Sequence, residues 1–377
     1  MDIYFILVQT HMVKYYLPLI IEANSFGINS NVILINKPGF NNSFDYEDDI
    51  LELSKEYDFN VLKGIKCIPS KGIVFIMEYR GIDLLKGKNY VVVLTHMSDF
   101  KHGGYYSRYE SNSKVKKIAM PGKYFAKIYE AESKKNMYYG SPKYDVKLNK
   151  QSIIDEYNLP EGKRALVIAP KKRDVEVINF PEIYRYLKRM GFTIIVKGRA
   201  KDRVPDYLKG DIFIEDVKWF PHPTMELIVA CDLLVNCGSS TIKEAVMLEI
   251  PIVNLNTKPY KKTFSVLYDY DYCISLNNDY KCSDCGGLIE LPESICGEIY
   301  TCECGHKESW IDILKCNISF EEFSNVVDEV MSRNLEPVFE RVKKRYLWNC
   351  NNVSRKILLE VLNDYPRSNV RVIKGDQ

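Results

Sequence analysis

The stretch from Asp232 to Asn254, which reads D-L-L-V-N-C-G-S-S-T-I-K-E-A-V-M-L-E-I-P-I-V-N, constrains the fold of this chain most. Leu233 to Asn236 is an apolar run of strand length, and Thr241 to Leu248 has the apolar spacing of a helix. Pro251 then opens another apolar run. A strand, a turn, a helix and a second strand in this order predict a parallel α/β sheet.

The turn in this stretch, Gly238-Ser239-Ser240-Thr241, has the composition of an anion site. In a parallel sheet such a turn lies at the ligand-binding edge, where backbone N–H groups and the helix dipole favour an anion. Glycine permits close approach of the backbone, and the three hydroxyls can donate to phosphate oxygens. Thr241 and Glu244 also fit a capping box, in which they only satisfy the first helical N–H groups. Both interpretations are open from this stretch alone.

Other predicted strands of the second half are also followed by basic side chains. Apolar runs at 165–169 and 193–196 predict strands, and 223–230 predicts a helix introduced by a histidine. Carboxyl ends of parallel strands share one edge, so these groups are expected to converge on one crevice suited to a diphosphate. The alternative is that each cluster is a solvated face. The candidate residues are Lys171, Arg173, Lys197, Arg199 and His222.

The first half opens with a second strand-helix-strand pattern, formed by Ile3–Val8, Val13–Ser25 and Asn31–Ile35. His11 lies in the turn after the first of these strands. A later strand at 90–94 is followed by His96 and Asp99. Strand ends of this kind present side chains to a ligand, so these three residues are candidates for a base and its partner.

Length and composition set broad limits. The chain has 377 residues, of which 46% are hydrophobic and 27% charged, which suits two globular domains with cores of their own. The turn-rich segment around Gly140 predicts one domain at 1–150 and a second at 151–365. We expect the first to lie on the acceptor side and the second to hold the nucleotide.

Two further segments complete the predicted organisation. Residues 39–58 are polar and acidic and predict a surface loop. Phe320–Met331 and Val338–Leu362 are amphipathic stretches, which predict closing helices within 319–365.

Charge and the N-terminal sequence exclude some classes of function. The 52 lysines and arginines against 50 acidic residues leave a net charge of +2, so nothing global favours a nucleic-acid or membrane-surface binder. The first apolar run is broken by Gln9, His11 and Lys14, which argues against a signal peptide or a membrane span. We therefore expect a cytoplasmic protein.

The 11 cysteines are scattered singly except between Cys282 and Cys304, which favours reduced thiols and one metal site. Two short turns, C-S-D-C-G-G and C-E-C-G-H, predict a zinc ribbon at 280–308, because tetrahedral zinc takes two ligands from each turn. The expected ligands of this structural Zn²⁺ are Cys282, Cys285, Cys302 and Cys304, with Cys296 or His306 as substitutes. The alternative is a set of reduced surface thiols. Asp269-Tyr-Asp271 matches a D-x-D motif but precedes a strand, so no catalytic metal is predicted.

With both halves considered, the chain resembles the glycosyltransferase B architecture, in which two Rossmann-like domains face a cleft and a C-terminal helix crosses back. It is most similar to the CDP-glycerol glycerophosphotransferase family, and more distantly to nucleotide-sugar transferases and non-hydrolysing UDP-N-acetylglucosamine 2-epimerases. The resemblance covers about Tyr90 to Tyr272. It is carried by the segments Y-V-V-V-L-T-H, Y-Y-G-S-P-K-Y-D, A-L-V-I-A-P-K-K-R-D, I-I-V-K-G-R and G-S-S-T-I-K-E-A-V-M-L-E-I-P-I-V-N.

The resemblance implies roles for several residues. The turn from Gly238 to Thr241 would hold the donor diphosphate, Glu244 the ribose hydroxyls, and Lys197 with Arg199 the leaving nucleotide, while His96 would be the acceptor-side base. The chain departs from these families in three places. It lacks the W-H-G segment of the phosphotransferases, it has Lys197-Gly-Arg199 in place of K-x-H, and it has Ser239-Ser240 in place of the epimerases' paired glycines. The ribbon belongs to none of the groups.

These observations predict a transferase that moves a glycosyl or alditol-phosphate group from a nucleotide-activated donor to an acceptor hydroxyl. The acceptor classes left open are a glycan, a polyol phosphate and a modified nucleic acid. The alternatives are a UDP-sugar 2-epimerase and a non-catalytic module that binds a nucleotide sugar or a polyanion.

Overall fold

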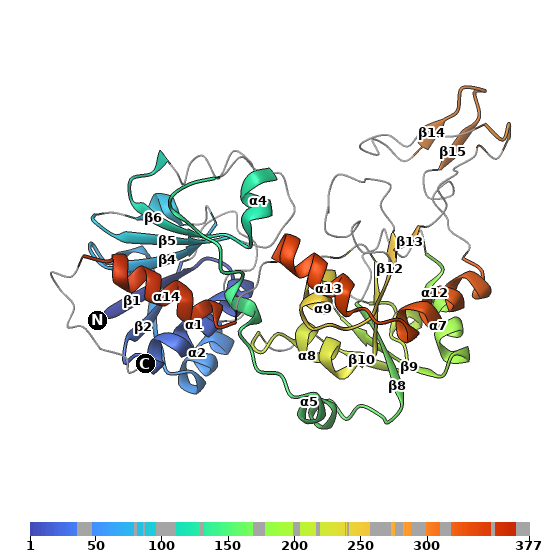
Figure 1. The fold of residues 1–377 in the computed structure, drawn as a ribbon, viewed down its shortest axis with the longest axis horizontal. Coiled ribbons are helices and arrows are strands. Elements are labelled where there is room, and N and C mark those ends of the chain that lie inside the picture. Colours follow the sequence, from blue (N-terminus) through green and yellow to red (C-terminus); the bar gives the residue numbers. More distant parts are fainter. Residues whose placement is uncertain are drawn as a thin grey trace. The chain divides into compact units, whose positions relative to one another are not determined.

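Two parallel β-sheets, each built by a different part of the chain, form the framework of the protein (Figure 1). The structure is a computed structural model, and it describes residues 1–35, 47–78, 81–85, 87–95, 111–128, 132–168, 178–198, 204–215, 219–237, 239, 241–256, 273–275, 282, 284–287, 299–309, 318–347 and 351–366.

The chain divides into two compact units. The N-terminal unit comprises Met1–Lys147, Lys218–His222 and Lys343–Gln377, and the C-terminal unit comprises Leu148–Val217 and Pro223–Val342. The roles of acceptor-side and nucleotide-side domain, and the domain limits at 150 and 365, stay predictions.

The N-terminal sheet has seven strands in the order β3-β2-β1-β4-β5-β6-β7, and its adjacent strands pair in parallel. Its middle strands are nearly continuous apolar runs because both faces of the sheet are covered. The chain builds outward from β1 in one direction and then from β4 in the other, so the topological switch point lies between these two strands. The strands are β1 (Asp2–Leu7), β2 (Asn29–Leu34), β3 (Asn60–Lys63), β4 (Ile73–Met77), β5 (Tyr90–Leu94), β6 (Val115–Ala119) and β7 (Asn136–Met137).

The helices of this unit are α1 (Val13–Ser25), α2 (Glu47–Glu56), α4 (Lys123–Ile128) and α14 (Val353–Asp364), with short 3₁₀ turns at Thr10–Met12, Ile65–Cys67, Ile82–Leu84 and Pro142–Tyr144. The prediction of a loop at 39–58 was wrong for its second part, which forms α2. Acidic residues fill the first turn of α2, where they suit the helix dipole, and Ile50 and Leu53 are buried one turn apart. The polar composition hid this narrow apolar stripe.

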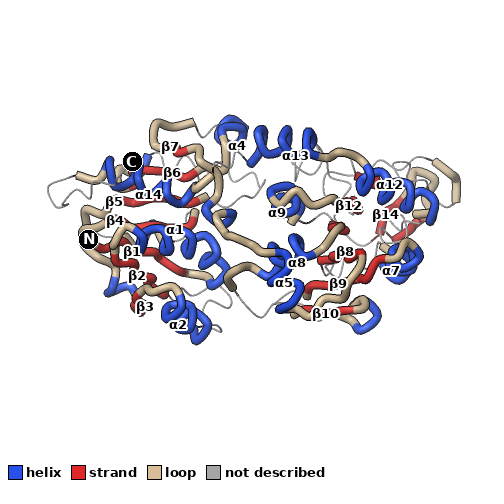
Figure 2. The backbone as a smooth tube through the Cα atoms, turned by 60° about the horizontal axis from the view of Figure 1, so that its bottom comes forward, coloured by secondary structure: helices blue, strands red, loops and turns tan. Residues whose placement is uncertain are grey.

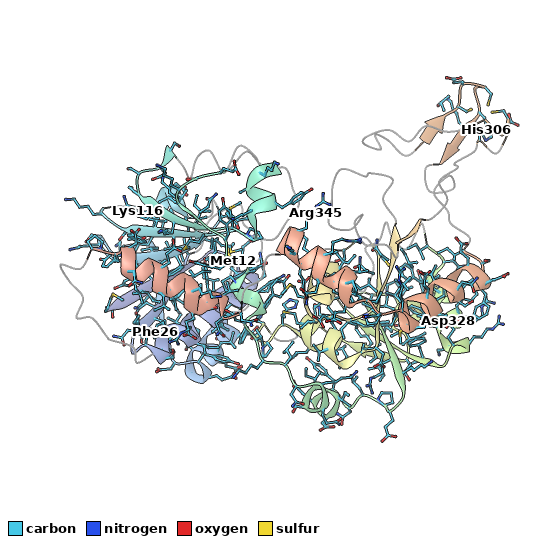
Figure 3. The ribbon with its side chains drawn as sticks, in the orientation of Figure 1. Met12, Phe26, Lys116, His306, Asp328 and Arg345 are labelled. Atoms are coloured by element: carbon cyan, nitrogen blue, oxygen red, sulfur yellow. The ribbon has the colours of Figure 1, made fainter. Side chains whose placement is uncertain are left out.

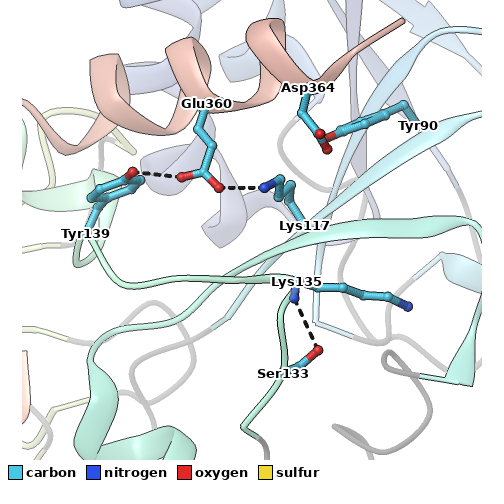
Figure 4. Close-up of polar contacts among 7 residues, drawn as sticks. All are labelled: Tyr90, Lys117, Ser133, Lys135, Tyr139, Glu360 and Asp364. Atoms are coloured by element: carbon cyan, nitrogen blue, oxygen red, sulfur yellow. Dashed lines mark hydrogen bonds and ion pairs between the residues drawn. The ribbon is translucent and has the colours of Figure 1, made fainter.

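Helix α14 is fixed to the N-terminal sheet by half-buried polar contacts (Figure 4). The Glu360 carboxylate accepts a hydrogen bond from the Tyr139 hydroxyl at 2.7 Å and pairs with the Lys117 ammonium at 2.6 Å. One turn further, the Tyr90 hydroxyl donates to Asp364 at 2.5 Å. Strands β5, β6 and the segment after β7 therefore all hold this helix.

The start of α14 is capped by a residue far away in sequence. Asn352, which precedes the helix, has a left-handed φ of 56° and makes no side-chain cap. The Asp145 carboxylate instead accepts from the backbone N–H of Val353 at 3.2 Å and of Ser354 at 2.5 Å. The predicted amphipathic stretch Val338–Leu362 is therefore broken into α13 (Glu336–Val342), a π-helical turn (Lys343–Leu347) and α14.

The C-terminal sheet has six strands in the order β10-β9-β8-β11-β12-β13, again parallel throughout, with its switch point between β8 and β11. Figure 2 shows β8, β9 and β10 side by side. Its strands are β8 (Lys163–Ile168), β9 (Phe192–Lys197), β10 (Ile212–Ile214), β11 (Leu233–Asn236), β12 (Ile252–Asn256) and β13 (Cys273–Ser275). Its helices are α5 (Lys150–Glu156), α7 (Phe180–Arg189), α8 (Pro223–Ala230), α9 (Ile242–Met247), α12 (Phe320–Ser332) and α13, with a 3₁₀ turn at Asp206–Leu208. A separate antiparallel pair is formed by β14 (Ile299–Thr301) and β15 (Lys307–Ser309).

Candidate functional site

The carboxyl ends of the C-terminal strands carry a row of residues at one level of the sheet. Ile168 pairs with Lys197, and Asn236 pairs with Asn254. The pairing of Val167 with Val235 one residue earlier brings these two pairs level across the switch point. Residues level in adjacent strands point to the same face, so Lys197, Asn236 and Asn254 share one face of the sheet.

The polar members of this row are buried. Lys197 is 3% exposed, Asn236 0% and Asn254 1%. The Asn236 side-chain amide donates to the Asn254 side-chain oxygen at 2.6 Å, and the Lys197 ammonium donates to the Gly198 carbonyl at 3.1 Å. The Asn236 side-chain oxygen is buried and accepts no hydrogen bond from the residues that the structure describes. Burying an amide and an ammonium is costly, so their gathering at a ligand-binding edge indicates a functional requirement.

The turn after β11 leads from this row into α9. The hydroxyls of Ser239 and Thr241 are 3.0 Å apart, and the Ser239 carbonyl accepts from the Ile242 N–H at 3.3 Å. Thr241 already has helical backbone angles, and its side chain makes no capping bond. The capping-box interpretation of Thr241 is therefore wrong, and its hydroxyl hydrogen-bonds the Ser239 hydroxyl instead. Glu244 lies in the first turn of α9.

Sequence reasoning missed Lys243. This lysine is 1% exposed and is among the largest fully buried side chains of the protein. A lysine beside a glutamate in a helical stretch with four apolar residues, I-K-E-A-V-M, was the available signal. Asn236 and Asn254 were likewise noticed only as strand ends; Asn236 does end β11, but Asn254 lies in the middle of β12.

The structure describes only some of the other residues predicted for the donor site. His222 belongs to the segment Lys218–His222, which packs with the N-terminal unit. The remaining candidates lie outside the described residues, so their predicted convergence on this edge stays a prediction: Lys171, Arg173, Arg199, Gly238 and Ser240. The D-x-D segment at 269–271 also lies outside them.

In the N-terminal unit, the turn after β1 lies at the switch point beside β4. His11 belongs to the 3₁₀ turn Thr10–Met12. Just before it, the Gln9 side-chain oxygen is buried and has no hydrogen-bond donor within the described part of the chain. After β5, the Thr95 hydroxyl donates to the Ala119 carbonyl at 2.6 Å. His96 and Asp99 follow directly but lie outside the described residues. This edge can offer hydrogen-bonding side chains to a ligand.

Four cysteines come together on two turns. The sulfur atoms of Cys282, Cys285, Cys302 and Cys304 all lie within 4.8 Å of one another. Cys282 is 3.8 Å from Cys304, and Cys285 is 3.6 Å from Cys302, so each contact joins one turn to the other. Four thiols at this spacing suit a tetrahedral metal ion.

The backbone shapes both turns in the same way. The Gly286 N–H donates to the Cys282 carbonyl at 2.9 Å, and the Gly305 N–H donates to the Cys302 carbonyl at 2.8 Å. These glycines have φ of 68° and 87°, a region that glycine adopts without strain. Hydrogen bonds from the backbone of Cys285 and then of Asp284 lower the pKa of Cys282 to about 7, despite the opposing effect of burial. His306 lies in the second turn but outside the group of four (Figure 3), and Cys296 is not among the described residues.

Comparisons with known proteins identify the fold. No protein-family model matches the chain, and neither does any of the curated sequences compared with it. A putative UDP-N-acetylglucosamine 2-epimerase from Listeria monocytogenes is similar in structure, with a TM-score of 0.58, 10% identity and 97% of each chain covered. The wall teichoic acid polymerase TagF has a TM-score of 0.56 and 13% identity, and the match covers 96% of this chain and 89% of that one. The glycotransferase of kitacinnamycin has a TM-score of 0.55 and 9% identity, with 97% and 99% covered.

The chain has the glycosyltransferase B fold. This confirms the resemblance drawn from the sequence, including the named relatives, and the parallel α/β architecture. Within this fold, the row of buried polar residues lies at the switch point of the second sheet. None of the helices that the structure describes has the length and apolarity to span a membrane.

Proposed function

We propose that this protein transfers a glycosyl or alditol-phosphate group from a nucleotide-activated donor to an acceptor hydroxyl. The observation that carries the proposal is the buried row of Lys197, Asn236 and Asn254 at the carboxyl edge of the second sheet. Transfer from such a donor requires a cationic, hydrogen-bonding environment for the departing phosphates. The shared fold supports the same activity, since similar structures include a polymerase and a glycotransferase.

On this proposal the second unit binds the donor. The Lys197 ammonium neutralises the leaving nucleotide, and the hydroxyls of Ser239 and Thr241 donate to the diphosphate. Glu244 accepts hydrogen bonds from the ribose. The predicted donor set also includes Lys171, Arg173, Arg199, Gly238 and Ser240. His222 stays a prediction for this set, although its segment packs with the N-terminal unit.

The first unit would supply the acceptor side. A base near neutral pKa removes the proton of the acceptor hydroxyl as its oxygen attacks, and the bond to the leaving nucleotide breaks. His96 is proposed as this base, with Asp99 or His11 as its partner. The position of His11 after β1, at the switch point, is consistent with this role.

Donor binding tests the proposal directly. We expect one class among CDP-, UDP-, GDP- and TDP-linked compounds to raise the melting temperature, because a ligand stabilises the protein only if it prefers the folded site. Glu244→Gln should weaken this binding severalfold. Glu161→Gln is the matched control, because Glu161 is exposed at the opposite end of the same sheet, just before β8. Equal effects of the two substitutions, or no stabilising donor, would contradict the proposal.

A second candidate function is epimerisation of a UDP-sugar. It is favoured by the similarity to a putative UDP-N-acetylglucosamine 2-epimerase, which extends over 97% of both chains. Incubation with UDP-N-acetylglucosamine alone separates the two, since an epimerase turns over without an acceptor. If donors bind but neither reaction occurs, the non-catalytic binding module is the remaining alternative.

We also propose that the four cysteines hold a structural Zn²⁺, as their mutual spacing supports. A four-thiolate site is closed to substrate, so the metal would stabilise the two turns and take no part in transfer. Metal analysis of the purified protein should give one zinc per chain, and Cys282→Ser should abolish it. Zinc retained in that variant, or never found, would contradict the assignment.

A further inference from the structure

Five lysines gather at the amino edge of the N-terminal sheet. Lys88 precedes β5, Lys114 and Lys116 lie at the start of β6, and Lys134 and Lys135 precede β7. Strands β5, β6 and β7 are neighbours in this parallel sheet, so their amino ends share one edge. Figure 3 labels Lys116 and, just after β1, Met12 toward opposite ends of the strands. These amino-edge lysines therefore lie away from the edge to which acceptor chemistry is assigned.

Backbone carbonyls fix the positions of three of these ammonium groups. The donor and acceptor residues are Lys114 with Leu85 at 2.6 Å, Lys116 with Ser113 at 2.7 Å, and Lys135 with Asn112 at 3.1 Å. Since Asn112 and Ser113 are adjacent before β6, the ammonium groups of Lys116 and Lys135 meet at one turn. A carbonyl orients an ammonium group but does not cancel its charge, so positive charge is held in place at this turn.

A β-bulge separates Lys116 from the residue that follows it. Val91 pairs with Val115 and Val92 with Lys117, so Lys116 is an extra residue in β6. The Lys117 ammonium pairs with Glu360 of α14 at 2.6 Å, whereas Lys116 is exposed. One lysine therefore holds a helix, and the other adds to the positive charge of the edge.

The amino-edge lysines are not neutralised as other lysines of the surface are. Lys88, Lys114, Lys116 and Lys134 form no ion pair with a carboxylate of the residues that the structure describes. Surface lysines of the C-terminal unit are paired, as Lys150 with Asp232 at 3.1 Å, Lys188 with Asp211 at 2.6 Å and Lys209 with Asp206 at 2.9 Å. The net charge of the chain is only +2, so this excess is local. Like charges brought together repel one another, and an anionic partner relieves that repulsion.

We propose that the amino-edge lysines bind linear polyphosphate, a flexible chain of directly linked phosphate groups. Lysine is a common phosphate ligand and binds as a point charge, without requiring one fixed geometry. Adjacent strands lie about 4.8 Å apart, so ammonium groups from β6 and its neighbours suit charges that follow closely along one chain.

Two other polyanions suit this surface less well. Single-stranded nucleic acid is bound by aromatic side chains that stack on its bases, and firm binding to a membrane surface adds apolar side chains that enter it. Within the described parts of 81–137, no large hydrophobic side chain is exposed. The surface offers charge alone, which is what a chain of phosphates requires. Because it lies at the opposite edge from the acceptor-side residues, this proposal goes beyond the proposed function and does not depend on it.

The salt dependence of binding tests the proposal. Fluorescently labelled polyphosphate of defined length is titrated with the full chain, and anisotropy gives the affinity at each salt concentration. If five cations are neutralised, affinity should fall about 100-fold between 50 and 200 mM salt, by the relation that holds for single-stranded polyanions. The triple variant Lys88→Gln, Lys116→Gln and Lys134→Gln keeps two of the five, so its affinity should be weaker and fall only about sevenfold over the same range.

Two further triple variants control for net charge and for folding. Lys150→Gln, Lys188→Gln and Lys209→Gln remove the same total charge from paired lysines and should bind as the wild type does. Lys88→Arg, Lys116→Arg and Lys134→Arg keep the charge and should also bind.

Three outcomes would overturn the proposal. They are no binding by the wild type, an unchanged salt dependence in the first triple variant, and tighter binding of oligo(dT) or of phosphatidylglycerol vesicles than of polyphosphate. Donor binding is measured separately by thermal shift without polyphosphate, so failure of one test leaves the other intact.

Discussion

The two sheets have the same topology but different residues at their carboxyl ends. In the N-terminal sheet, Leu7 pairs with Leu34, Met77 with Leu94, and Leu94 with Ala119, and all of these are buried and apolar. In the C-terminal sheet, the residues at the corresponding level include Lys197 and Asn236, which end their strands, and Asn254 within β12, all equally buried. One sheet is apolar at this level, and the other keeps buried polar groups there.

On the proposed function, this difference would give the two edges different tasks. Acceptor chemistry in the N-terminal unit would come from residues that follow its apolar strands in sequence, such as His11 in the 3₁₀ turn after β1. Donor recognition in the C-terminal unit would use the buried polar groups of the sheet, because their positions are set by the strands. We therefore expect donor binding to depend on strand residues and acceptor chemistry to depend on loop residues.

The largest expected effect is at Lys197. Lys197→Met keeps the length of the side chain but removes its charge, and should weaken donor binding by about 2–5 kcal/mol, because a buried cation facing phosphate oxygens has no substitute. Leu34→Met, in the apolar row of the other sheet, should leave donor affinity unchanged. Titration calorimetry with the stabilising donor measures both. If both variants bind donor as the wild type does, the contrast between the sheets has no bearing on recognition.

A smaller effect is expected at Asp145, which belongs to the N-terminal unit alone. Asp145→Ala removes the cap of α14 and should lower the stability of this unit by about 1–2 kcal/mol. Asp145→Asn should lose less, because one carbonyl oxygen remains to accept from Val353 or Ser354. Hydrogen exchange of α14 would report the change. Donor affinity should stay as it is, and a loss there would show that the two edges are not independent.

The sequence alone predicted the helices and strands whose limits follow from a local pattern of apolar residues. Helix α1, strand β5, helix α8 and strand β11 were predicted with the limits that the structure has. Each has a strong apolar pattern bounded by polar or turn residues, so neighbouring residues alone specify it.

The parts that were missed depend on contacts between distant segments. Asp145 caps a helix that starts at Val353, and Trp219 binds Asp49, separations that no local pattern reveals. The burial of Lys243 is a tertiary property as well. The turn after β11 was located correctly, but whether Thr241 caps its helix depends on its backbone angles, which composition does not specify.

The smallest expected effect is a difference in the alkaline stability of the two units. Burial raises the pKa of the Cys231 thiol, next to β11, from 9.0 to about 12. Burial and the Asp364 carboxylate raise the pKa of Tyr90, in β5, above its usual 10.0. Each raised pKa means that the native state keeps a proton that the unfolded chain releases, so stability is complete below the unfolded pKa and falls as pH rises above it.

The C-terminal unit should therefore begin to lose stability near pH 9, by about 0.8 kcal/mol at pH 9.5, and the N-terminal unit only near pH 10. Cys231→Val should make the loss at pH 9.5 smaller, because the raised pKa of this thiol no longer contributes to it. Urea unfolding from pH 7 to 11, followed by hydrogen exchange in each sheet, measures the loss in each unit. An unchanged loss in Cys231→Val would show that the thiol does not contribute to the difference.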